Sequence, residues 1–136
     1  MRKKQAHTDE LQAITMPSVK EYLTAVQRDG SELCSDEIFC QTMEWLKSRN
    51  CENAVSEQIV EQYAMSVARW VHIEQMISKY GYIAKHPTTG APMQSPYVMM
   101  SQAYMKQIIA IRAEIQALVK SSCPSSLTIR EVVYGE

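Results

Sequence analysis

The fold is decided by residues 54–80, which read AVSEQIVEQYAMSVARWVHIEQMISKY, and by residues 97–121, which read YVMMSQAYMKQIIAIRAEIQALVKS. In the second stretch, apolar residues recur at steps of four, three, four and three: Tyr104, Ile108, Ile111, Ile115 and Leu118. This rhythm is an a/d pattern, which turns one stripe of a helix toward a partner. We therefore predict an all-α chain built around a long antiparallel hairpin of two helices.

The first stretch carries two apolar stripes. One consists of Ile59, Tyr63, Trp70, Ile73, Ile77 and Tyr80, and the other of Val60, Ala64, Val67 and Val71. A helix with one neighbour needs a single stripe. Two stripes indicate two neighbours, which we interpret as the other helix of the hairpin and a second copy of the chain. The residues predicted to hold copies together are Tyr63, Val67, Trp70, Ile77, Tyr104, Ile108, Ile111, Ile115 and Leu118.

Composition allows one domain, or a small head on a hairpin stalk. The 136 residues are 46% hydrophobic and 21% charged, an ordinary globular mixture. The formal net charge of -1 excludes a polycation, so any contact with nucleic acid needs a local basic patch or several copies acting together. No stretch reaches the length of a membrane span and the N-terminus lacks an apolar signal core, so we expect a cytosolic protein.

Before the hairpin we expect a flexible basic arm over residues 1–15 and a helical head over residues 16–52. Pro17 suits the start of a short helix, and Gly30 suits its end. Its apolar stripe would consist of Val19, Tyr22, Leu23 and Val26. Ser35 suits the N-cap of a second helix that runs to Arg49. Two short helices and a tight turn have helix-turn-helix proportions. The hairpin then covers residues 53–122, and a short tail covers residues 123–136.

Basic residues of the arm and head are the candidate DNA contacts. They are Arg2, Lys3, Lys4, Lys20, Arg28, Lys47 and Arg49. Lys and Arg at such positions can contact phosphates. The alternative is a solvated face, in which the head cations are balanced by Glu21, Asp29, Glu44 and Glu52.

Two further segments have weaker patterns. Residues 82–96 contain Thr89-Gly90, a turn signal, between Pro87 and Pro92, which favour extended backbone. We expect either a small β-like flap or a segment that docks on a neighbour. The tail alternates enough over residues 127–134 to form a short strand.

Catalytic and metal-binding motifs are missing from the sequence. There is no nucleophile elbow, paired-acid motif, HExxH motif or dinucleotide fingerprint. Cys34, Cys40, Cys51 and Cys123 lack CxxC spacing, so we expect reduced thiols and no metal site. The sequence predicts a protein that is not an enzyme and that needs no cofactor.

The hairpin also carries a resemblance to a known family. The order of its motifs is Glu61-Gln62-Tyr63-Ala64, Ala68-Arg69-Trp70, Glu74, Ile77, Tyr80-Gly81, Thr89-Gly90, Pro92 to Tyr97, and Cys123-Pro124-Ser125-Ser126. In this order the chain resembles the small subunit of phage terminase over about residues 54–126. The family often has Gly and Arg where Cys123 and Leu127 stand here, so the resemblance says less about that end.

The resemblance implies a non-catalytic function. Members of the family assemble as homo-oligomeric rings, recognise the packaging site on double-stranded viral DNA, and present it to the large terminase subunit, which holds the ATPase and nuclease. The N-terminal head would then bind DNA, the hairpin would form the ring, and the protein would act in the cytoplasm of a bacterial host.

Two other functions remain possible from the residues alone. A helix-turn-helix transcription regulator would normally be a dimer, with a more basic recognition helix than residues 35–49. A helical adaptor would use the hairpin for protein contacts only.

Overall fold

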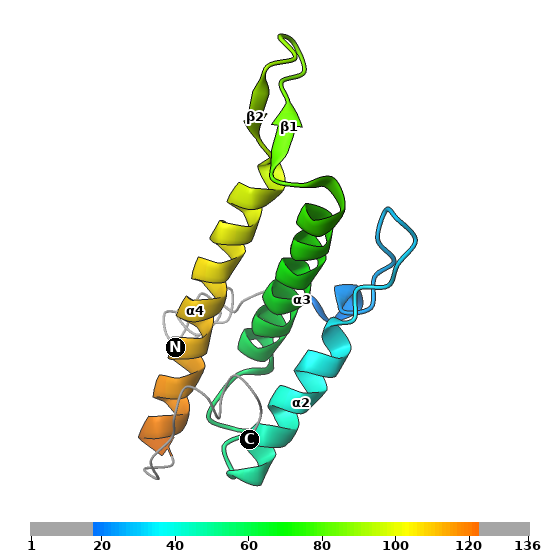
Figure 1. Ribbon diagram of the computed structural model, residues 1–136. Coiled ribbons are helices and arrows are strands. Elements are labelled where there is room, and N and C mark those ends of the chain that lie inside the picture. Colours follow the sequence, from blue (N-terminus) through cyan, green and yellow to red (C-terminus); the bar gives the residue numbers. More distant parts are fainter. Residues whose placement is uncertain (1–17, 123–136) are drawn as a thin grey trace, which may run out of the picture.

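The computed structural model describes residues 18–122, and the helical hairpin dominates it. The elements in chain order are a 3-10 helix η1 (Lys20–Tyr22), α2 (Ser35–Ser48), α3 (Glu57–Tyr80), β1 (Ile83–Lys85), β2 (Pro92–Gln94) and α4 (Pro96–Ser122). Helices α3 and α4 lie side by side and antiparallel, α2 packs on the other side of α3, and the two strands project from the closed end of the hairpin (Figure 1). The prediction of an all-α chain with a long antiparallel hairpin is confirmed.

The ends of the two long helices follow from local signals in the sequence. Ser56 caps α3, because its Oγ accepts a hydrogen bond from the Ile59 N–H at 3.4 Å. Gly81 ends the helix at a φ of 82°, where its N–H donates to the Ile77 carbonyl at 2.7 Å. Pro96 opens α4, as expected for a residue whose missing N–H would have had no partner in the first turn.

The connection between the long helices is a small antiparallel β-hairpin, so the β-like flap, one of the two expected alternatives, is confirmed. Docking of this segment on a neighbour stays a prediction. Ile83 pairs with Gln94, and Lys85 pairs with Pro92. Gly90 takes the left-handed conformation in the turn, at a φ of 68°. The flap leaves Ile83 65% exposed at the closed end of the hairpin.

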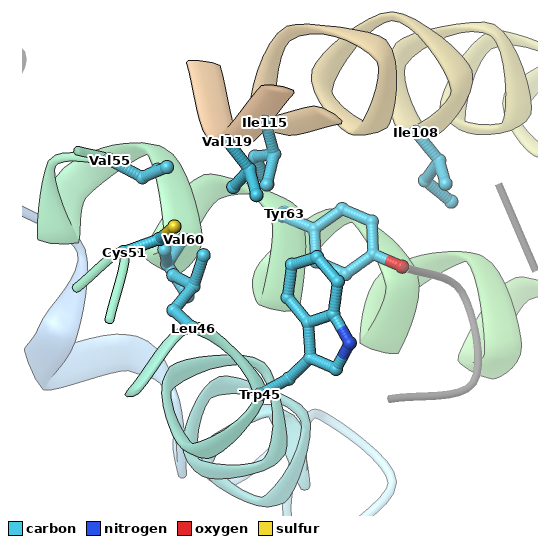
Figure 2. Close-up of a cluster of buried hydrophobic side chains, with 9 residues drawn as sticks. All are labelled: Trp45, Leu46, Cys51, Val55, Val60, Tyr63, Ile108, Ile115 and Val119. Atoms are coloured by element: carbon cyan, nitrogen blue, oxygen red, sulfur yellow. The ribbon is translucent and has the colours of Figure 1, made fainter. Parts of the chain in front are cut away.

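One hydrophobic core joins α2 to both long helices. Figure 2 shows it as Trp45, Leu46, Cys51, Val55, Val60, Tyr63, Ile108, Ile115 and Val119. Tyr63 from the first stripe of α3 shares this core with Ile108 and Ile115 of α4, and Val60 from the second stripe shares it with Leu46 of α2. The second neighbour of α3 is therefore α2, and the stripe pattern alone does not require another copy. The division into head and hairpin at residues 52 and 53 stays a prediction.

The predicted first helix of the head is wrong. Apart from the three residues of η1, the chain from Val19 to Cys34 forms a loop, which the Leu33 N–H closes by donating to the Ala25 carbonyl at 2.9 Å. The apolar residues of the expected stripe do not share one buried face, since Leu23 is 4% exposed and Val26 is 73% exposed. Among residues 18–56 the chain thus has one α-helix, α2, and the helix-turn-helix proportions are not reproduced.

The loop competes with a helix through its own polar groups. Asp29 Oδ1 accepts hydrogen bonds from the Ser31 N–H at 3.0 Å and the Ser31 hydroxyl at 2.5 Å. Such short-range bonds favour turns over helices. Gly30, which lies between Asp29 and Ser31, adopts a left-handed backbone conformation with a φ of 87°. The same Ser31 hydroxyl holds the pKa of Asp29 below its ordinary value, because it stabilises the carboxylate.

Two buried polar residues attach the loop segment to the helices. The Ser35 hydroxyl donates to the Leu23 carbonyl at 2.6 Å, and Ser35 is the first residue of α2 and not its N-cap, which corrects the expected capping role. The Glu61 carboxylate of α3 is 2% exposed and accepts from the Ser18 hydroxyl at 3.0 and 3.1 Å and from the Val19 N–H at 3.2 Å. These bonds position the segment across α3.

The cysteines divide into two groups. Cys34 and Cys40 are free and exposed. Cys51 is buried and disulfide-bonded, which corrects the expectation of a reduced thiol there. The predicted arm, including Arg2, Lys3 and Lys4, and the predicted strand in the tail also lie outside residues 18–122.

Candidate nucleic-acid interface

The C-terminal end of α2 carries two of the predicted DNA contacts on a well-defined turn. The Cys51 N–H donates to the Leu46 carbonyl at 2.8 Å, and the Asn50 N–H donates to the Lys47 carbonyl at 3.0 Å. Asn50 itself adopts the left-handed conformation, at a φ of 56°. This bond pair is a Schellman motif, with Asn where Gly is commonest. It holds the backbone that carries Lys47 and Arg49.

The two basic side chains at this end differ in exposure. Lys47 is exposed, whereas Arg49 is half-buried with its guanidinium carbon 5.0 Å from the centre of the Trp45 ring. A cation over an indole face is attracted by the ring's electron density. Positive charge is also favourable at the C-terminus of a helix. Lys47 and Arg49 therefore stabilise the end of α2, besides being candidate phosphate contacts.

The other two predicted DNA contacts lie near the opposite end of α2. Lys20 and Arg28 are exposed on the loop segment, and the Ser35 bond to Leu23 fixes that segment at the start of the helix. Since a helix rises 1.5 Å per residue, about 20 Å of α2 separates this end from Lys47. The four head residues therefore do not gather in one basic site.

Arg28 also borders a groove that sequence reasoning missed. The groove has a volume of about 600 Å³ and lies between α3, α4 and the loop around Arg28. Its other basic residues are Arg69 and Lys79, both on α3. With His72 they recur at steps of three and seven, which places them on one helix face, so a signal was present in the sequence. The contribution of the loop could not be foreseen, because a helix was expected there.

The residues predicted to hold copies together divide into two groups. Tyr63, Ile77, Ile108 and Ile115 are at most 6% exposed and are buried within one chain. Val67, Trp70, Tyr104, Ile111 and Leu118 are only partly buried. The first four have almost no surface left for another copy, and the other five keep some.

Two structural findings bear on other classes of site, and both concern residues 18–122. No group of three His, Cys, Asp or Glu in this range could hold a metal ion. No helix in the same range is both long and apolar enough to cross a membrane.

Comparison with known protein families identifies a match. The model of a family described as phage terminase, small subunit, matches residues 36–116, which is more than half of the chain and runs from the start of α2 into the last third of α4. Comparisons with curated proteins and with solved structures found no match.

Proposed function

Because the chain belongs to the phage terminase small-subunit family, we propose that it is the non-catalytic component that binds viral DNA at the packaging site and delivers it to the large terminase subunit. The large subunit would supply the ATPase and the nuclease, in the cytoplasm of the bacterial host. The family match carries the proposal, because it covers all of α3 and most of α2 and α4.

The proposal includes assembly as a homo-oligomeric ring. Its contacts would come from the partly exposed members of the predicted set, Val67, Trp70, Tyr104, Ile111 and Leu118. Ile109, at 48% exposed, and Met99, at 65% exposed, add apolar surface on α4. Assembly would bury this surface, which is the usual driving force for association.

Assembly would also make DNA binding effective. One chain has a formal net charge of -1, and its proposed contacts with double-stranded DNA are split between Lys47 and Arg49 at one end of α2 and Lys20 and Arg28 at the other. The arm residues Arg2, Lys3 and Lys4 would add further phosphate contacts. A ring that presents many copies to one duplex gains affinity through effective concentration.

A salt titration of DNA binding tests the proposed contacts. The protein is titrated with a packaging-site duplex and an unrelated duplex, as wild type and as the double variant Lys47→Gln and Arg49→Gln. The slope of log affinity against log salt should fall by about 0.9 for each phosphate that the variant no longer neutralises. The control Lys106→Gln and Lys120→Gln removes the same charge from exposed positions on α4 and should keep the wild-type slope.

Three results would count against the proposal. A wild-type protein that stays monomeric in size exclusion with light scattering would contradict the ring. A dimer that prefers a palindromic site over packaging DNA would indicate a transcription regulator. A protein that binds neither duplex would indicate an adaptor.

A further inference from the structure

The groove between α3, α4 and the loop combines positive charge with aromatic side chains. Arg28 comes from the loop, Arg69 and Lys79 from α3, and Tyr97 and Tyr104 from α4. Arg28 and Lys79 are exposed, whereas Arg69 and the two tyrosines are half-buried. Three segments that are distant in the sequence thus converge on one trough of about 600 Å³.

The charge of the groove is mainly positive. Among its lining residues, Asp29 is the single carboxylate, and it is already engaged by both donors of Ser31. Its charge also interacts with His72 of α3, which lines the groove as well. Arg28, Arg69 and Lys79 therefore outnumber the acid by three to one, so the groove favours an anionic ligand.

The basic side chains are held in position by neighbours that leave donors for a ligand. Arg69 Nη1 donates to Gln27 Oε1 at 2.9 Å, which uses one of the five N–H donors of the guanidinium. Lys79 Nζ lies 5.3 Å from the centre of the Tyr80 ring. Tyr80 in turn stacks on Tyr97, with ring centres 6.4 Å apart and an angle of 17° between the planes. This stack links the end of α3 to the start of α4 and shapes the groove beside the flap.

We propose that this groove binds the sugar–phosphate backbone of DNA, as a second contact surface on the hairpin. Arg, Lys, Gln and Tyr side chains are the usual donors to phosphate oxygens, and all four types line the groove. Aromatic rings beside cations can also stack on the bases of an unpaired strand. An acidic peptide has no bases, so this feature favours DNA over such a peptide. Lys79 lies at the C-terminal end of α3, whereas α2 ends near the N-terminal end of α3, so this surface is separate from Lys47 and Arg49. The inference rests on the proposed function, because it assumes that the chain binds DNA.

The test compares two triple variants of the full chain with the same change in charge. The groove variant is Arg28→Gln, Arg69→Gln and Lys79→Gln. The control is Lys85→Gln, Lys106→Gln and Lys120→Gln, three exposed lysines that do not line the groove. Each is titrated with a labelled duplex, with a single strand of the same sequence, and with polyglutamate. Because Arg69→Gln also removes the bond to Gln27, the double variant Arg28→Gln and Lys79→Gln is measured beside it.

The groove variant should bind DNA at least about tenfold more weakly than the control. Its salt slope should also be smaller, by about 0.9 for each duplex phosphate that it no longer neutralises and by about 0.7 for each phosphate of a single strand. If the groove variant loses more affinity for the duplex than for the single strand, the groove binds duplex DNA. The opposite result would show that it binds the single strand.

Equal binding by the groove variant and the control would overturn the inference and leave the proposed function intact. Weaker binding of polyglutamate alone would also overturn it and indicate an acidic protein partner. If the wild type binds no DNA, both proposals fail together.

Discussion

The Ser101 hydroxyl of α4 donates a hydrogen bond to the Glu74 carboxylate of α3, across the interface between the two long helices. Ser101 is 8% exposed and Glu74 is half-buried, so water reaches this bond poorly. Trp70 lies one turn before Glu74 on α3, and Tyr104 lies close to one turn after Ser101 on α4. The hairpin is thus joined by a polar contact on the side of its core nearest the flap.

Replacing Ser101 with Ala should destabilise the chain. The Glu74 carboxylate would lose this donor in a partly buried site, and leaving such a group without its partner costs about 1–3 kcal/mol. Chemical denaturation followed by circular dichroism measures the change in the free energy of unfolding. Ser78→Ala, at an exposed position on α3, is the matched control and should stay within about 0.5 kcal/mol of wild type. Equal effects of the two changes would show that the bond contributes little.

Two isoleucines of α4 should respond very differently to truncation. Ile115 is 0% exposed within the shared core, whereas Ile109 is 48% exposed. Ile115→Ala should therefore cost about 2–5 kcal/mol, because it removes buried methyl groups and leaves a cavity. Ile109→Ala should change the free energy of unfolding of the chain by less than about 1 kcal/mol. Urea titrations of both variants check the contrast. If Ile109→Ala strongly lowered the free energy of unfolding of the dissociated chain, the exposed position of Ile109 on α4 would be contradicted.

The long helices could be predicted because their signals are local. Ser56, Gly81 and Pro96 mark their ends through capping and backbone conformation, and the apolar rhythm of α4 marks the face that meets α3. These effects act within a few residues, so they can be read along the chain.

The head and the groove could not be predicted because they depend on contacts between distant residues. The stripe around Leu23 suggested a helix, but Ser35 and Glu61 hold that segment as a loop from positions 12 and 43 residues away. The second stripe of α3 required a partner, and nothing in the pattern distinguished α2 from another copy. Since the groove needs Arg28 on that loop, the incorrect helix also concealed the groove.

Asn50 should tolerate Gly but not Ala. Its φ of 56° lies in the left-handed region, which costs most L-residues about 1–2 kcal/mol and which Asn tolerates better. Asn50→Ala should therefore lower the free energy of unfolding by about 1 kcal/mol, while Asn50→Gly should leave it unchanged or raise it slightly. Thermal unfolding checks the order of the three proteins. Asn53→Ala, at an exposed position of the following turn, should have little effect.

The stability of the chain should fall at high pH, in part through Tyr63. This side chain is 5% exposed in the core between α3 and α4, and burial raises the pKa of its hydroxyl above the ordinary value, an effect that the positive charge of Arg112 partly offsets. The folded chain therefore keeps the phenolic proton at pH values where the unfolded chain has lost it. This contribution to stability is complete below about pH 10 and is lost as the pH rises through the folded-state pKa.

Denaturation as a function of pH, for the wild type and for Tyr63→Phe, isolates this effect. The variant has no phenolic proton at position 63, so its free energy of unfolding should decline less steeply above about pH 10. Tyr82→Phe is the control, because it removes the same hydroxyl from a side chain that is 70% exposed. Ultraviolet absorbance of tyrosinate gives a second readout, since the signal missing from Tyr63→Phe should appear above about pH 10. If that signal is complete by about pH 10, Tyr63 is more accessible to water than its place in the core indicates.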